Sequence, residues 1–152
     1  GLPIGAYGGR REIMALLAPI GPVYQAGTNS GNPLVMAAGL ATLARLTPEL
    51  YANLERSAAR LADGLTRLAG PNASVQRVGS MMTLFFLREG AAPGPIRNAD
   101  DLERVDRERY AAFFRRALER GVFLPPSACE AFFLTAAHTP AIVDETLERL
   151  AG

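Results

Sequence analysis

The chain contains no lysine: all 16 of its basic Lys and Arg side chains are arginines. It has one cysteine, Cys129, which permits no disulfide within the chain and favours a reducing compartment. No nucleophile signature surrounds Cys129, so a passive role is favoured over a catalytic thiol. No apolar run reaches the length of a membrane span, and the first residues lack a basic segment followed by an apolar core. We therefore expect a soluble, cytoplasmic protein.

The composition is that of a globular protein with one domain, or one domain and a tail. At 152 residues and 49% hydrophobic, the chain is long enough to bury a core. Its formal net charge of +1 comes from interspersed acidic and basic residues, which gives no footprint for nucleic acid or an anionic membrane surface. No metal site is expected.

A loop rich in glycine and hydroxyl groups, residues 24–33, leads directly into an apolar helix. Asn32 is a favoured N-cap residue and Pro33 suits the first helical position, so a helix is predicted to begin there. Gly27 lets the backbone approach a ligand closely, and Thr28 offers a hydroxyl and an N–H beside the positive end of the helix. The pattern suits a phosphate, although an ordinary capped turn has the same composition, and the residues alone favour the turn.

Hydrophobic periodicity predicts an α/β chain of the α+β kind, with a small antiparallel sheet and helices packed on one face. The helix after the loop, residues 34–46, is apolar on nearly every side and should be buried at a domain or subunit boundary. The other expected helices are residues 10–17, 47–69, 106–120 and 139–150, and the expected strands are residues 75–78, 81–87, 122–124 and 132–135.

Three motifs resemble those of one enzyme family. They are the stretch from Gln25 to Leu34, the opening from Gly1 to Arg11, and Glu130 to Phe133 followed by Ala137 to Thr139. Together they resemble glutamate-1-semialdehyde 2,1-aminomutases, pyridoxal-phosphate enzymes of the class III aminotransferase type, over nearly the whole chain. The resemblance implies the C-terminal part of a fold-type-I transferase. Residues 1–46 would then be the tail of the large cofactor-binding domain, and residues 47–152 a small C-terminal domain.

The resemblance also implies a reaction, and a catalytic lysine that this chain does not contain. Members of the family use pyridoxal and pyridoxamine 5'-phosphate to convert glutamate-1-semialdehyde to 5-aminolevulinate, the tetrapyrrole precursor. Their chemistry needs a lysine that forms a Schiff base with the cofactor, and in the family this lysine lies a few residues before the motif that begins here at Gly1. Because the chain has no lysine, we expect it to be a fragment that is inactive alone.

Particular residues receive roles from the same resemblance. Gly27 and Thr28 would bind the cofactor, and in a homodimer Thr28 would contact the cofactor of the partner subunit. Glu130 would lie near the substrate, although a glutamate before an apolar run more often faces solvent. His138, next to a helix cap, is expected to be structural. Ordinary packing or solvation is the simpler interpretation of Tyr24, Gln25, Arg10 and Arg11.

Two rival hypotheses remain open. One is another class III aminotransferase acting on an ω-amino substrate, against which the Gln25–Thr28 and Ala137–Thr139 motifs argue. The other is a non-catalytic domain that retains only a dimerisation surface, which the absence of lysine would suit.

Overall fold

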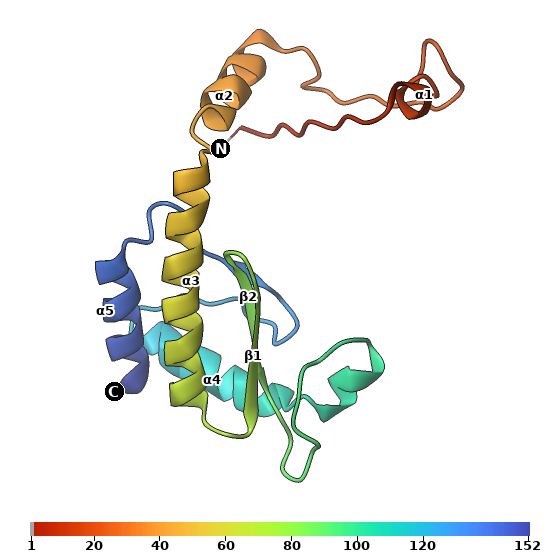
Figure 1. Cartoon of the computed structure of the whole chain (residues 1–152). Coiled ribbons are helices and arrows are strands. Elements are labelled where there is room, and N and C mark those ends of the chain that lie inside the picture. The colour runs from red at the N-terminus through yellow and green to blue at the C-terminus, as the bar shows by residue number, and fades with distance from the viewer. Residues whose placement is uncertain (1) are drawn as a thin grey trace. The chain divides into compact units, whose positions relative to one another are not determined.

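The computed structural model describes residues 2–152, which divide into two compact units, the first reaching Thr47 and the second spanning Pro48–Gly152. The first unit contains helix α1, Arg11–Met14, and helix α2, Pro33–Leu43, joined by the glycine-rich loop (Figure 1). No helix among residues 2–152 is apolar over a stretch long enough to cross a bilayer.

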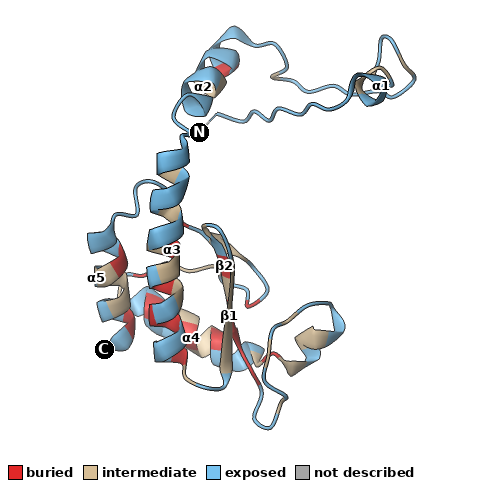
Figure 2. Ribbon diagram, viewed as in Figure 1, coloured by how far each residue is buried: buried red, intermediate tan, exposed pale blue. Residues whose placement is uncertain are grey.

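Both helices of the first unit are shorter than the sequence predicts. α1 covers only the middle of the expected residues 10–17, and α2 ends at Leu43 instead of Leu46. Within the described chain only Val35 of α2 is buried, while Leu34, Leu40 and Leu43 are 72%, 69% and 58% exposed (Figure 2). Residues 2–152 therefore do not bury α2 on nearly every side, although the sequence predicts such burial. Residues 2–10 form neither a helix nor a strand.

The second unit is a three-stranded antiparallel sheet with helices, as the sequence predicts. The strand order is β1-β2-β3. Its elements in chain order are α3 Pro48–Ala69, β1 Ala73–Val78, β2 Met81–Phe86, the 3-10 helix η1 Asp100–Arg104, α4 Arg107–Glu119, β3 Phe132–Phe133 and α5 Pro140–Ala151. Helices α3 and α4 contact the sheet, and α5 packs on α3 and α4 (Figure 1).

The two faces of the sheet are covered differently. The ring of Phe86 in β2 meets Phe113 of α4 edge to face, with 5.3 Å between centroids. Gln76 pairs with Thr83 and therefore lies on the opposite face, because side chains alternate along a strand. There its amide donates to the carbonyl of Ile96 at 2.9 Å and accepts from the N–H of Ile96 at 2.7 Å. The loop after β2 is thereby tied to the sheet.

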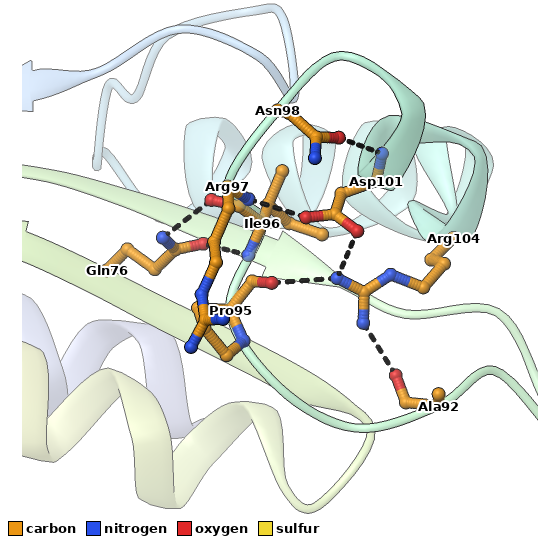
Figure 3. A network of polar contacts seen from close by, with 8 residues as sticks. All are labelled: Gln76, Ala92, Pro95, Ile96, Arg97, Asn98, Asp101 and Arg104. Atoms are coloured by element: carbon orange, nitrogen blue, oxygen red, sulfur yellow. Dashed lines mark hydrogen bonds and ion pairs between the residues drawn. The ribbon is translucent and has the colours of Figure 1, made fainter.

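The glycines and prolines of this loop predict only a polar surface segment, but the loop has an ordered polar network (Figure 3). The Arg104 guanidinium donates to the carbonyls of Ala92 at 2.8 Å and Pro95 at 2.7 Å, and pairs with Asp101 at 3.1 Å. Such contacts between a side chain and distant backbone groups leave no periodic signal in the sequence.

Helix packing in the second unit is close enough to require a glycine. Gly64 of α3 is buried, and a Cβ atom there would overlap the side chain of Leu147 in α5, whose Cγ would lie 2.9 Å away. Around this contact the core residues of α3 recur at helical spacing. They are Ala58, Leu61, Leu65 and Ala69.

Several sequence expectations for the second unit are wrong. Helical periodicity predicts that Leu68, Leu118 and Ile142 face inward on α3, α4 and α5, but they are 40%, 48% and 42% exposed, because the buried stripe of each helix is narrower than its apolar face. Residues 122–124 form no strand: Val122 is buried and donates to the carbonyl of Ala117 at 2.8 Å, so it closes the end of α4 instead.

Candidate functional site

The glycine-rich loop and the N-terminal segment line one hollow in the first unit. Its volume is about 610 Å³. It is lined by Pro3, Ile4, Gly5, Ala6, Tyr7, Gln25, Gly27, Thr28, Asn29, Ser30, Gly31 and Met36. The two glycine-rich segments that carry the family resemblance therefore meet at one place, although about twenty residues separate them in the chain. Sequence analysis did not single out Tyr7, which borders the hollow.

The loop is folded by two consecutive backbone turns. The N–H of Ser30 donates to the carbonyl of Gly27 at 2.9 Å, and the N–H of Asn32 donates to the carbonyl of Asn29 at 3.1 Å. Gly31 has φ of 75°, a conformation that glycine adopts without strain. A Cβ at Gly27 would lie 3.1 Å from the Ser30 hydroxyl oxygen, so the turn leaves little room for a side chain there.

The helix cap is made by Asn32 and uses all the N–H groups of the first turn of α2. The Asn32 Oδ1 atom accepts from the N–H of Leu34 at 3.0 Å and of Val35 at 3.3 Å, and its carbonyl accepts from Met36 at 2.9 Å. Pro33 has no N–H. The predicted cap and helix start are therefore confirmed, but this first turn offers no unused N–H group to an anion.

Thr28 retains the donors that the first turn of α2 lacks. It is exposed at the hollow, and within residues 2–152 no hydrogen bond uses its hydroxyl or its N–H. A hydroxyl and an N–H on adjacent atoms of one residue, beside a glycine and near the positive end of a helix, suit a phosphate group. The residues present thus fit an anionic cofactor group, with Thr28 rather than α2 as its donor.

Glu130 belongs to the second unit and lies in a tight turn. Its Oε2 atom accepts from the N–H of Ser127 at 3.2 Å, and its own N–H donates to the Ser127 carbonyl at 3.2 Å. The side chain is exposed, and no hydrogen bond among residues 2–152 uses its Oε1 atom. Glu130 therefore stabilises its own turn with one carboxylate oxygen and presents the other outward.

Tyr110 of α4 contacts this turn from the core. It is 3% exposed, and its hydroxyl donates to the carbonyl of Pro125 at 2.7 Å. Burial, and secondarily the negative charge of Glu130, raise the pKa of Tyr110 to about 12. The hydroxyl is therefore protonated, and remains a donor, at any physiological pH. The sequence indicated only that Tyr110 is a core residue.

The remaining candidates have ordinary roles. His138 accepts the N–H of Thr135 on its Nδ1 atom at 2.9 Å, which confirms the structural role expected beside the capped helix α5. Cys129 is an exposed free thiol. Arg10 and Arg11 are exposed at the start of α1.

Solved structures identify the fold. The chain superimposes with a TM-score of 0.73 on a β-phenylalanine aminotransferase from Variovorax paradoxus, with 31% identity over 95% of this chain and 33% of that one. An ω-transaminase from Sphaerobacter thermophilus gives the same TM-score at 24% identity, over 95% of this chain and 33% of that one. The fold is that of a segment of a transaminase.

Sequence comparison gives the family. A model described as Aminotransferase class-III matches residues 1–150, and the chain belongs to this family. It is 50% identical to a glutamate-1-semialdehyde 2,1-aminomutase from Desulfatibacillum aliphaticivorans, over 97% of this chain and 35% of that protein. It is also 50% identical to the enzyme of that name from Sorangium cellulosum, over 97% of this chain and 33% of that protein. The chain spans about a third of the length of these relatives.

Proposed function

We propose that the chain is the C-terminal part of a cytoplasmic, pyridoxal-phosphate-dependent glutamate-1-semialdehyde 2,1-aminomutase, which makes 5-aminolevulinate for tetrapyrrole synthesis. One observation carries the proposal: a chain half identical to enzymes of that name folds the two glycine-rich segments that carry the resemblance around one hollow, with the unused donors of Thr28 at its edge. In this proposal residues 1–46 belong to a cofactor-binding domain and residues 47–152 form a small domain.

The first unit would hold the cofactor by its phosphate. The Thr28 hydroxyl and N–H would donate to phosphate oxygens, and Gly27 would let the backbone approach them. When bound, the pyridoxal or pyridoxamine form supplies a nitrogen carrier and an electron sink for moving an amino group between neighbouring carbons. The lysine that this chemistry needs is absent from residues 1–152, so another part of the enzyme has to supply it.

The second unit would contact the substrate through Glu130. Its outward Oε1 atom is a charged acceptor without a partner among the described residues, and glutamate-1-semialdehyde carries an ammonium group. We assign Glu130 the role of orienting that ammonium. Because Oε2 is held by Ser127, the carboxylate would be oriented before the substrate arrives.

A homodimer completes the proposal. α2 exposes Leu34, Leu40 and Leu43, a larger apolar face than a helix that meets only water usually shows. Coverage by a second copy would place Thr28 near the subunit boundary, where it would serve the cofactor of the partner subunit.

The experiment is an assay of the complete enzyme with glutamate-1-semialdehyde. Formation of 5-aminolevulinate without any added amino donor or acceptor is the expected result, because an isomerase returns the nitrogen to the same substrate skeleton. The structural similarity to a β-phenylalanine aminotransferase makes transamination the competing activity. A requirement for a keto-acid acceptor would therefore contradict the proposal and favour an aminotransferase, and absence of both activities would favour a non-catalytic domain.

A further inference from the structure

The segment that carries Glu130 is held to the rest of the second unit by apolar contacts and by few hydrogen bonds. Among residues 2–152, the hydrogen bonds of Ser127, Cys129 and Glu130 all lie inside the turn, between these three residues. Ala128 is buried and anchors the turn by apolar contact. Among the described residues, one hydrogen bond alone joins residues 123–131 to another part of the chain, and it is the bond from the Tyr110 hydroxyl to the Pro125 carbonyl.

We propose that Tyr110 is a positioning residue, which fixes the turn of residues 125–130 and thereby holds the Glu130 carboxylate in place for the substrate. The inference rests on the proposed function for its substrate, but the tether itself is a property of the second unit. It assigns a role to a buried hydroxyl that the core does not need for packing, since phenylalanine has almost the same shape.

The chemistry of Tyr110 suits a tether and excludes direct catalysis. Its single proton is committed to the Pro125 carbonyl at 2.7 Å, so the hydroxyl cannot also donate to Glu130. The raised pKa of Tyr110 keeps that proton in place. The bond starts from the first turns of α4, a rigid element capped by Asp106, whose side chain accepts from the N–H of Arg109 at 2.9 Å. The bond from Tyr110 therefore attaches the turn to a rigid helix, α4.

Pro125 and Pro126 strengthen the argument. Two consecutive prolines restrict the backbone entering the turn, so holding the carbonyl of Pro125 also restrains the direction in which Ser127 and Glu130 follow. Without the tether the prolines would still stiffen the segment, but its orientation would depend only on apolar contacts, those of Leu124 and Ala128 with the core and of Phe123 with Phe114.

The test compares Tyr110→Phe with Tyr51→Phe in the complete enzyme. Tyr51 is 55% exposed in α3, and no hydrogen bond among the described residues uses its hydroxyl, so the same chemical change there is a matched control. Hydrogen–deuterium exchange of the peptide covering residues 123–131 reports opening of the turn. Exchange should be about threefold to tenfold faster in Tyr110→Phe, the range that one neutral hydrogen bond is worth, and unchanged in Tyr51→Phe.

Kinetics then decide whether the tether serves the substrate. We expect the KM for glutamate-1-semialdehyde to rise by about threefold to tenfold in Tyr110→Phe, with unchanged cofactor content. Unchanged exchange would overturn the tether, and faster exchange with wild-type kinetics would overturn the positioning role. If the wild-type enzyme has no aminomutase activity, the proposed function fails, whereas the exchange rates still decide whether Tyr110 holds the turn.

Discussion

Thr28 and Asn32 lie four residues apart in one loop, and the structure predicts opposite consequences for their replacement by alanine. Asn32 accepts two N–H groups of α2 and no described contact assigns it to a ligand, so Asn32→Ala should lower the free energy of unfolding by about 1 kcal/mol. Thr28 makes no hydrogen bond within residues 2–152 and is exposed. Thr28→Ala should therefore change the stability of the apoprotein by less than about 0.5 kcal/mol.

Cofactor binding should reverse this order. A hydrogen bond to a charged phosphate is worth about 1.5–3 kcal/mol, which corresponds to a Kd about 10-fold to 150-fold higher in Thr28→Ala. At a pyridoxal-phosphate concentration of about 100 times the wild-type Kd, binding stabilises the wild type by about 2.7 kcal/mol. A 30-fold weaker variant would gain only about 0.9 kcal/mol. Asn32→Ala should gain nearly as much as the wild type.

The assay is thermal unfolding of the complete enzyme and the two variants, each measured without cofactor and over a cofactor titration. A stability loss in apo Thr28→Ala equal to that of Asn32→Ala would show that Thr28 caps the turn. An unchanged cofactor titration for Thr28→Ala would refute the phosphate contact.

Mixed dimers test whether Thr28 acts across the subunit boundary. One subunit carries Thr28→Ala and the other lacks the Schiff-base lysine. If Thr28 serves the partner's cofactor, both defects fall on the site of the lysine-deficient subunit, so the other site stays intact and activity returns to about half of the wild-type value per dimer. Proven heterodimers without restored activity would show that Thr28 serves its own subunit or no cofactor.

Three further predictions concern other parts of the chain. Glu130→Gln in the complete enzyme should lower kcat/KM while cofactor content and melting temperature stay nearly constant, and an unaltered rate would return Glu130 to the solvent-facing class. Gly64→Ala should lower the free energy of unfolding by about 1–3 kcal/mol through overlap with Leu147, despite the better helix propensity of alanine. In denaturant unfolding, the double variant with Leu147→Ala should lose less stability than the sum of the two single variants, because the overlap is gone. Purified residues 1–152 should show no aminomutase turnover because they contain no lysine. Measurable 5-aminolevulinate from this chain would show that the reaction does not need that lysine.

Features set by neighbouring residues were predictable from the sequence. Asn32–Pro33 and Thr139–Pro140 start helices because cap and first-turn preferences are local, and both caps are present. The hairpin between β1 and β2 likewise follows from Gly79, whose φ is 58°. The expected strand at residues 122–124 failed because a strand needs a neighbour, and the C-terminal end of α4 engages Val122 instead.

For the candidate site, the sequence predicted which residues are candidates, but not which contact each of them makes. The sequence placed a cap, hydroxyl groups and a helix dipole together, which suggests that they act jointly on an anion. The distances show that Asn32 occupies the first-turn N–H groups of α2, so the unused donors belong to the loop before it, Thr28 among them. The bond from Tyr110 to Pro125 joins residues fifteen positions apart, and neither periodicity nor a motif marks it.

The exposure of α2 follows from the same distinction between local and distant determinants. Its cap and proline fix where the helix begins, whereas its apolar face needs a surface that residues 2–152 do not supply. Burying a fully exposed leucine is worth about 1.5–3 kcal/mol, so Leu34, Leu40 and Leu43, which are on average about two-thirds exposed, together offer about 3–6 kcal/mol to whatever covers them. That gain reaches the lower end of the stability of a small domain, about 5 kcal/mol. Association through α2 and formation of the adjacent Thr28 hollow are therefore expected to depend on each other, because the loop and the helix share the cap at Asn32.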